Sequence, residues 1–151
     1  MNIGGIQVTN CEELLVLPRA NGKDIPIRAK AVSIHEDFEK MVPMPTPPLI
    51  QKKGGNVSDL EDKDFKKAMK RRSDQRFAYL CIRSLEPSNI EWEVVDVENP
   101  ATWLKWTDEL LAAGLSENEC NRIVGAVLAA NSLDEEKIEE ARKAFLLGQG
   151  E

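Results

Sequence analysis

The chain has 151 residues, of which 42% are hydrophobic and 30% are charged, and its formal net charge at pH 7 is −6. This composition is typical of a folded domain and excludes a fully disordered chain. No apolar run approaches the roughly 18 residues of a membrane span, and the first ten residues lack the basic start and apolar block of a secretory signal. We therefore expect a cytoplasmic protein with no membrane partner.

The N-terminal part predicts a β-hairpin followed by a short helix. An apolar run at 14–17 and a loosely alternating segment at 25–34 flank Asn21-Gly22, a pair that tolerates the positive φ of a tight turn. Two strands alone are marginal in water, so the hairpin must pack on the rest of the chain or pair with another chain. Residues 35–42 predict about two turns of helix. One face of the second strand would carry Ile25, Ile27, Ala29 and Ala31.

Residues 43–58 differ in composition from the rest of the chain. Half of the eight prolines lie at 43–48, and Lys52-Lys53 and Gly54-Gly55 follow them. Proline removes backbone donors and favours extended geometry, while glycine and lysine favour solvation. We predict an extended, partly mobile linker between an N-terminal unit, 1–42, and a helical domain, 59–151. A docking peptide for an aromatic groove is the alternative interpretation.

A long charged helix is predicted after the linker. Ser58-Asp59-Leu60-Glu61 matches a capping box, and further acidic residues follow where the helix dipole favours negative charge. The helix should end near Glu86-Pro87, because the residue before proline avoids helical geometry. Residues 90–97 then alternate, with Ile90, Trp92 and Val94 on one side, and predict a short strand-like connector.

The last third predicts three helices joined by tight turns. Asn99-Pro100 would begin the first helix and Gly114 would end it. Two S-x-x-E capping boxes, at 116–119 and 132–135, should begin the other two near Glu117 and Leu133. Apolar residues with helical spacing are Trp103, Trp106, Leu110 and Leu111 in the first, Cys120, Ile123, Val124, Val127 and Leu128 in the second, and Ile138, Ala141 and Phe145 in the third.

Together these patterns predict a mostly α-helical protein. Its C-terminal helices would form a compact module with its own core, because short connections force neighbouring helices to pack together. The long charged helix would precede that module, and the small β-hairpin would lie at the N-terminus. The last third contains so little loop that almost no room remains for an active site. This favours binding over catalysis.

The sequence carries no motif of an enzyme. There is no phosphate-binding glycine loop, no G-x-S-x-G and no H-E-x-x-H. The only histidine, His35, lies beside Glu36 and Asp37, but adjacent helical residues point in different directions. The three cysteines form no C-x-x-C pair, and Cys81 and Cys120 lie in apolar helical contexts where a thiol packs as a core residue. We predict a protein that is not an enzyme and has no cofactor or metal.

A basic tract lies within the predicted long helix. Residues 51–86 carry a net charge of +4, whereas residues 87–151 carry −9. The tract could neutralise phosphates of a nucleic acid or dock an acidic partner. It could also remain a solvated helix whose positive charge balances the acidic C-terminal module. The solvated helix is favoured, since no aromatic residue is interleaved with the cations and the overall chain is acidic. The basic patch consists of Lys66, Lys67, Lys70, Arg71, Arg72 and Arg76.

The three tryptophans of the chain lie close together in the sequence. Trp103 and Trp106 are three residues apart on one predicted helix, so both can face the same groove, and Trp92 lies in the preceding connector. Tryptophan serves cores and interfaces alike. Core packing is favoured, and a mixed role places Trp103 inward and Trp92 toward a partner. The inferred partner-binding residues are Trp92, Trp103, Trp106 and Leu110.

Most of the chain resembles the tail assembly chaperones of long-tailed bacteriophages. The resemblance spans roughly 25–149, including the proline-rich segment and the charged helix. The segments that carry it are Ser84-Leu85, Ile90-Glu91-Trp92, Asn99-Pro100-Ala101-Thr102-Trp103, Leu110, Ala113-Gly114-Leu115-Ser116, Ala129-Ala130-Asn131-Ser132-Leu133 and Ala141-Arg142-Lys143-Ala144-Phe145-Leu146.

This resemblance implies a non-enzymatic role in the cytoplasm of an infected or lysogenic bacterium. Such chaperones bind the long, helical tape measure protein, keep it soluble and recruit tail tube subunits around it. A small helical module suits this role, because its grooves can accept an apolar helix. A homo-oligomer is left open, and a nucleic-acid-associated regulator that uses the basic helix 66–76 is the alternative function.

Overall fold

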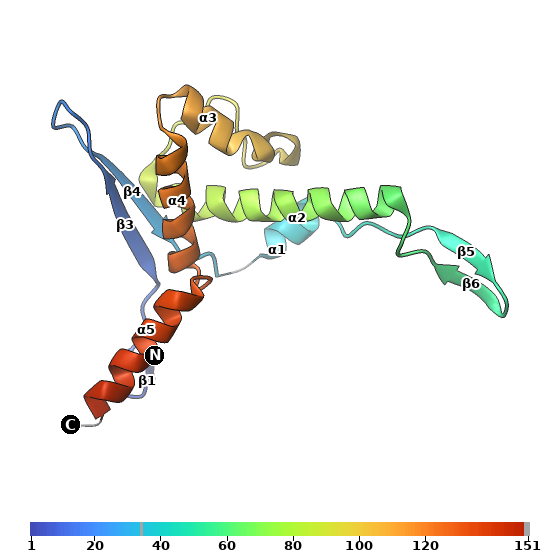
Figure 1. Ribbon diagram of the computed structural model, residues 1–151, viewed down its shortest axis with the longest axis horizontal. Coiled ribbons are helices and arrows are strands. Elements are labelled where there is room, and N and C mark those ends of the chain that lie inside the picture. Colours follow the sequence, from blue (N-terminus) through green and yellow to red (C-terminus); the bar gives the residue numbers. More distant parts are fainter. Residues whose placement is uncertain (34, 150–151) are drawn as a thin grey trace.

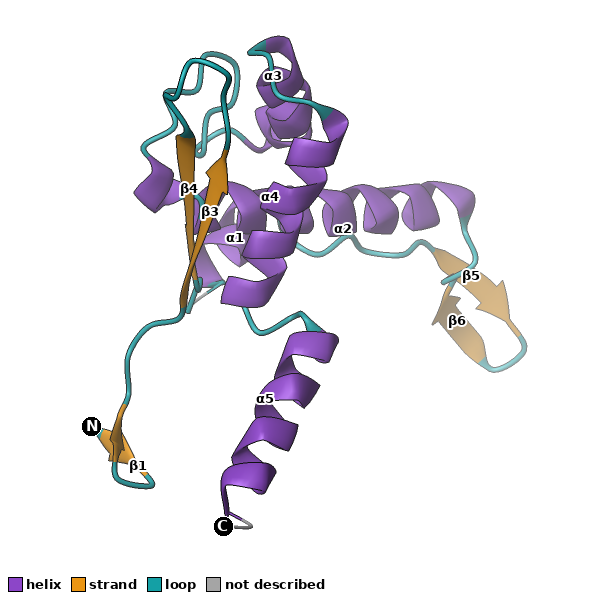
Figure 2. Ribbon diagram, turned by 60° about the vertical axis from the view of Figure 1, so that its left-hand side comes forward, coloured by secondary structure: helices purple, strands orange, loops and turns teal. Residues whose placement is uncertain are grey.

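The computed structural model describes residues 1–33 and 35–149. From a central body project the first half of a long helix, with a small hairpin at its tip, the C-terminal helix and the short N-terminal strands (Figures 1 and 2). The strands are β1 (Asn2–Ile3), β2 (Ile6–Gln7), β3 (Glu12–Leu17), β4 (Ile25–Lys30), β5 (Leu49–Lys52) and β6 (Gly55–Ser58). The helices are α1 (Glu36–Met41), α2 (Lys63–Ser84), α3 (Trp106–Ala112), α4 (Glu117–Ala130) and α5 (Glu135–Gln149), with the 3-10 helices η1 (Glu86–Ser88) and η2 (Pro100–Lys105). The predicted mostly α-helical class, with a long charged helix and a small N-terminal hairpin, is confirmed.

The hairpin β3–β4 packs one face on the body. Its antiparallel register pairs Glu12 with Lys30 and Leu17 with Ile25, and Gly22 takes a φ of +73° in the connecting turn. Its inward face includes the buried Ile27 and Ala29, as the alternation predicts, and the strands contact α4. The predicted second strand extended to position 34, which lies outside the described residues, whereas β4 ends at Lys30.

One hydrophobic core joins parts of the chain that are distant in sequence. Leu17, Ile27, Ala29 and Phe38 from before position 43 belong to the same cluster as the C-terminal half of α2 and the inner face of α4. The rings of Phe38, Tyr79 and Trp103 pack against one another, with centroids 4.7 to 6.0 Å apart. The C-terminal helices therefore share their core with the N-terminal hairpin and do not build one alone. Phe38 and the adjoining α1 bear out the short helix predicted at 35–42.

The segment predicted as an extended linker contains a hairpin. Strands β5 and β6 pair antiparallel, with Lys52 opposite Gly55, so residues 49–58 form a hairpin where an unpaired extended segment was predicted. Gly54 and Gly55 have φ values of +105° and +127°, a conformation that glycine adopts without steric cost. Lys53 and Gly54 therefore form the tight turn, Gly55 begins β6, and the hairpin stands at the N-terminal end of α2 (Figures 1 and 2).

Two of the predicted helix starts are displaced. Helix α2 begins at Lys63, where the Asp62 carboxylate accepts the backbone N–H of Phe65 at 2.9 Å, because Ser58 is already paired in β6. Helix α5 begins at Glu135, and Asp134 rather than Ser132 accepts the backbone N–H of Lys137 at 3.1 Å. Ser132 has a φ of +57°, which is not the extended geometry of a capping residue.

Two further predictions in the C-terminal part are wrong. Residues 90–97 form no strand and run as an irregular segment, because their amides are bound by a side chain of α3 and not by a neighbouring strand. Helix α5 does not pack on α4 but projects from the body (Figure 2), with Ile138 45% and Phe145 60% exposed. The module predicted from three helices therefore comprises η2, α3 and α4 only.

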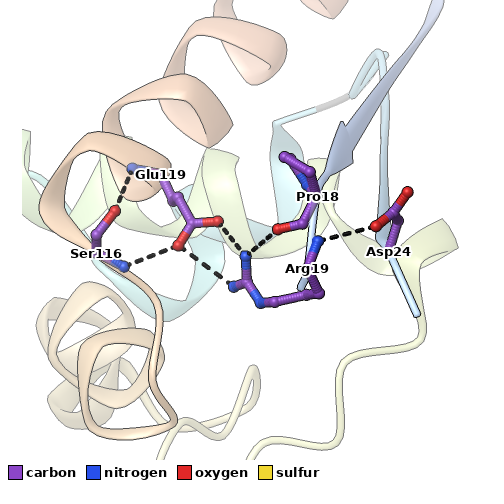
Figure 3. Close-up of polar contacts among 5 residues, drawn as sticks. All are labelled: Pro18, Arg19, Asp24, Ser116 and Glu119. Atoms are coloured by element: carbon purple, nitrogen blue, oxygen red, sulfur yellow. Dashed lines mark hydrogen bonds and ion pairs between the residues drawn. The ribbon is translucent and has the colours of Figure 1, made fainter. Parts of the chain in front are cut away.

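The N-terminus of α4 is joined to the β3–β4 hairpin by one side chain (Figure 3). Ser116 and Glu119 form the predicted capping box, and the Glu119 carboxylate also accepts two hydrogen bonds from the Arg19 guanidinium, at 2.6 and 3.3 Å. Asp24 accepts the backbone N–H of Arg19 at 2.8 Å and holds the turn that carries it. Glu119 therefore stabilises a helix end and a long-range contact together.

Replacing Glu119 by Gln should lower the melting temperature at neutral pH, because the pair with Arg19 loses its charge. The bond from Arg19, and then the backbone N–H of Ser116, lower the pKa of Glu119 below its ordinary value. A carboxylate with a lowered pKa stabilises the fold above its unfolded pKa, near 4.3, and this contribution is lost as pH falls through the folded pKa. Thermal melts across pH should show the difference between wild type and variant shrinking below about pH 4. Glu117→Gln, an exposed neighbour in the same helical turn, serves as the control.

Candidate partner-binding groove

Two of the three tryptophans belong to the core. Trp103 is fully buried, and its indole N–H donates to the carbonyl oxygens of Asp96 and Val97 at 3.1 and 3.2 Å. Trp106 is 5% exposed. The Asn99 side chain accepts the N–H of Ala101 and begins η2, which places both rings inward. The free protein does not offer Trp103 or Trp106 to a partner, and core packing, the favoured interpretation, holds for both.

Trp92 lies instead at a surface groove of about 580 Å³ between the irregular segment 90–94 and α3. Its side chain is half-buried, and Leu110 lines the groove while being itself nearly buried. This placement matches the mixed role, with Trp103 inward and Trp92 at the surface. The groove is lined by Ile90, Glu91, Trp92, Glu93, Val94, Lys105, Asp108, Glu109, Leu110, Ala112 and Ala113.

Glu109 holds the two walls of this groove together. Its carboxylate on α3 accepts the backbone N–H groups of three successive residues, Glu93, Val94 and Val95, the latter two at 3.0 and 2.9 Å. Burial alone would raise the pKa of Glu109, but the three donors outweigh it and lower the pKa below its ordinary value. The ionised side chain thus substitutes for the strand partner that segment 90–97 lacks.

The rim of the groove is mostly acidic. Glu91, Glu93 and Asp108 add carboxylates around an apolar floor, and Lys105 is the one cation among the lining residues. The backbone N–H groups of 93–95 are occupied by Glu109 and are not available to a ligand. Such a site can bury apolar side chains through Trp92 and Leu110 and attract cations at its edge.

The basic patch is not a continuous exposed surface. Arg72 is 6% exposed, pairs with Glu39, donates from Nε to the carbonyl of Val42 at 3.2 Å and lies 5.0 Å above the centre of the Phe38 ring. Its assignment to the patch is therefore wrong, because it anchors α1 to α2. Lys66 pairs with Glu61, Lys70 with Asp74 at 3.5 Å, and Arg76 with Glu39 at 4.0 Å.

The partners of these cations lie nearby on α1, α2 and the turn before α2. The acidic C-terminal module, which was the expected counterpart, supplies none of these partners. Among the described residues, only Lys67 and Arg71 of the patch have no carboxylate within ion-pair distance. The tract is thus largely neutralised within the chain, which weakens its attraction for phosphates.

Sequence reasoning missed Glu109 and Phe38, the residues that organise the groove and the aromatic core. Nothing in the spacing of a single glutamate on a helix indicates that it will bind amides fourteen to sixteen residues earlier. The cysteines are placed as predicted, with Cys81 and Cys120 buried, and burial raises the pKa of Cys81 to about 12. That thiol therefore stays protonated and unreactive.

In the part of the chain that the structure describes, no cluster of His, Cys, Asp and Glu has the arrangement of a metal site. No helix within that part is both long and apolar enough to cross a membrane. Comparisons with protein-family models, with curated proteins and with solved structures found no match to this chain. The groove at Trp92 is accordingly the site on which a function can be argued.

Proposed function

We propose that this protein is a non-enzymatic tail assembly chaperone of a long-tailed phage. In this role it binds the tape measure protein in the host cytoplasm, keeps it soluble and helps to recruit tail tube subunits. The proposal joins the resemblance of residues 84–146 to one structural observation. That observation is the groove beside Trp92, an apolar floor with an acidic rim on a protein of net charge −6.

The groove suits an amphipathic helix with an apolar stripe. Trp92 and Leu110 offer apolar contact area, and aromatic anchors of this kind dominate the binding energy of many interfaces. Carboxylates at Glu91, Glu93 and Asp108 would attract lysine or arginine residues flanking the client's stripe. The net negative charge of the complex would keep an aggregation-prone client dispersed.

The shape of the groove depends on Glu109. Its three hydrogen bonds hold segment 93–95 against α3 and thereby fix the position of the adjoining Trp92. A preformed groove binds more tightly than one that must be ordered by its ligand, because less conformational entropy is lost on binding. Glu109 therefore acts as a positioning residue for Trp92.

Co-expression with the tape measure protein of the same phage should raise the soluble fraction of that client. Trp92→Ala should abolish the effect, because it removes the half-buried indole from the groove lining. Glu109→Ala should weaken the effect, because it keeps the indole but releases the segment 93–95 that positions it. Leu111→Ala is the matched control, since Leu111 is on α3 but outside the groove lining. The readout is the client in the cleared lysate, with thermal melts of each purified variant to show that it is folded.

Two outcomes would contradict this proposal. One is an unchanged soluble fraction of the client in the presence of the wild-type chain. The other is retention of the full effect by a folded Trp92→Ala variant. If the chain bound DNA instead, with an affinity that fell steeply with salt, the regulator built on helix 66–76 would replace the chaperone.

A further inference from the structure

The first eight residues of the chain lie away from the body, beyond the start of β3 (Figures 1 and 2). All eight are exposed, and their strands β1 and β2 hold two residues each. A single two-stranded hairpin is marginal in water even when its strands are longer. Ile6 and Val8, which are 71% and 52% exposed, therefore present apolar side chains to solvent on a segment that the body does not support.

The adjoining strand β3 has a free edge. On the far side of its partner β4, the Ser88 hydroxyl accepts the backbone N–H of Arg28 at 2.8 Å and donates to its carbonyl at 2.7 Å. These groups of Arg28 are therefore not bonded to Leu14, which lies opposite in the register. Because backbone direction alternates along an antiparallel ladder, Glu12, Leu14 and Val16 direct their N–H and carbonyl groups away from β4. No described residue forms a backbone hydrogen bond with them.

Strand β3 lacks the features that usually keep such an edge unpaired. Proteins protect an edge with lysine, proline or a bulge. The sequence of β3 is Glu-Glu-Leu-Leu-Val-Leu, and its six residues pair with β4 in unbroken register. On its outer face, Leu14 and Val16 are 56% and 49% exposed. The edge thus offers backbone groups and apolar side chains together, which is what another extended strand recognises.

The exposed residues on the two sides of Cys11 complement each other. When two copies of the segment 6–16 are aligned antiparallel with Cys11 opposite Cys11, apolar residues face apolar residues and the carboxylate on this face meets an amide donor. The facing pairs are Ile6 with Val16, Val8 with Leu14, and Asn10 with Glu12. A register centred on Leu14 would instead set Glu12 against Val16. The pattern therefore indicates a second copy of the chain, in one register, as the strand that fits the edge.

We propose that residues 6–16 of this chain pair antiparallel with residues 6–16 of a second copy, with Cys11 at the two-fold axis. The contact is isologous, so the same segment serves both subunits and the assembly closes at two copies. The free backbone groups of β3 in each copy gain partners in residues 6–10 of the other. This inference does not depend on the proposed client.

The pairing requires β1 to leave β2. In the single chain Ile3 pairs with Ile6, and the N–H of Val8 donates to the carbonyl of Met1 at 3.0 Å. These bonds occupy the backbone groups that the second copy needs. Strand β1 holds only two residues, both exposed, whereas the new ladder is longer and covers the apolar side chains on both sides of Cys11. Strand β1 is therefore a weak competitor of the dimer.

Sedimentation equilibrium of the reduced full chain, from micromolar to hundreds of micromolar, should show a monomer–dimer equilibrium. Val8→Lys should make the protein monomeric over that range, because position 8 faces Leu14 of the other copy but lies exposed within its own. Matching thermal melts would show that the variant is folded. Leu104→Lys, at an exposed leucine outside the segment, should leave the dimer intact. A monomeric wild type, or a dimer that survives Val8→Lys, would overturn the proposal.

Deletion of residues 2–4 should strengthen the dimer. Without β1, the backbone groups of Ile6 and Val8 are free before the second copy arrives, so the dissociation constant should fall several-fold in the same sedimentation experiment. An ordinary interface weakens when chain next to it is removed, so the direction of the change is informative. A weaker dimer would show that β1 belongs to the contact and would contradict the proposed arrangement.

Engineered cysteines report the register. In a Cys11→Ser background, Val8→Cys alone and Leu14→Cys alone should not cross-link, because like positions lie roughly 20 Å apart on a rise of about 3.4 Å per residue. A mixture of the two proteins should form a disulfide-linked dimer on mild oxidation, because facing Cα atoms are about 5.5 Å apart. Non-reducing electrophoresis gives the readout. Equal cross-linking of either variant alone would show another register and overturn the pairing centred on Cys11.

Discussion

Replacing Val127 by Asp should abolish folding at room temperature. Val127 has no exposed surface and lies on the face of α4 that enters the shared core. A buried carboxylate without a partner costs several kcal/mol, and the total stability of a domain is only about 5–15 kcal/mol. Far-UV circular dichroism and a urea titration should show an unfolded protein with no cooperative transition.

The same charge at an exposed position of the same helix should have little effect. Asn121→Asp places a carboxylate on the outer face of α4, and surface substitutions usually change stability by about 0.5 kcal/mol or less. This variant separates the cost of burial from that of added negative charge. A Val127→Asp protein with the melting curve of Asn121→Asp would show that α4 does not bury this face.

Trp103→Ala should lower the stability by about 3–5 kcal/mol, the usual cost of removing a large buried aromatic side chain. The indole is fully buried against Phe38 and Tyr79, and the variant would leave a cavity between α1, α2 and η2. It would also remove the donor that serves the carbonyls of Asp96 and Val97. Denaturant unfolding followed by circular dichroism gives the difference in the free energy of unfolding.

Two further tryptophan variants help to explain the stability loss of Trp103→Ala. Trp103→Phe keeps an aromatic ring but loses the N–H donor, so its smaller loss measures the hydrogen bonds and the volume difference together. Trp92→Ala removes a half-buried ring at the groove and should cost clearly less than Trp103→Ala. Equal losses at positions 92 and 103 would contradict the division between a core tryptophan and a surface tryptophan.

The parts of the fold that the sequence predicts correctly depend on local chemistry. Ser116 and Glu119 cap α4 because both hydrogen bonds join residues three apart. Gly114 ends α3 with a φ of +115°, a conformation that few other residues accept. The inward face of β4 follows from its alternation alone. In each case the signal comes from residues close together in the sequence, and no distant residue competes with it.

The errors arise where distant residues compete with a local pattern. Ser58 and Ser132 have capping-box spacing, but one is paired in a strand and the other takes a positive φ, so an aspartate caps the helix instead. Segment 90–97 alternates like a strand, yet Glu109 binds its amides. Arg72 resembles its basic neighbours but is buried and pairs with the exposed Glu39. Tertiary contacts of this kind leave no mark on spacing or composition.

The shared core has a consequence for the order of events during synthesis. The inner face of the β3–β4 hairpin is covered by α4, and Val32 donates to the Asn131 side chain at 2.8 Å across almost a hundred residues. That side chain also donates to the Ser84 hydroxyl at 3.1 Å, which joins the end of α2 to the same point. Helix α4 must therefore leave the ribosome before the β3–β4 hairpin can bury its apolar face. A chain truncated before α4 is exposed to aggregation through the uncovered face of that hairpin.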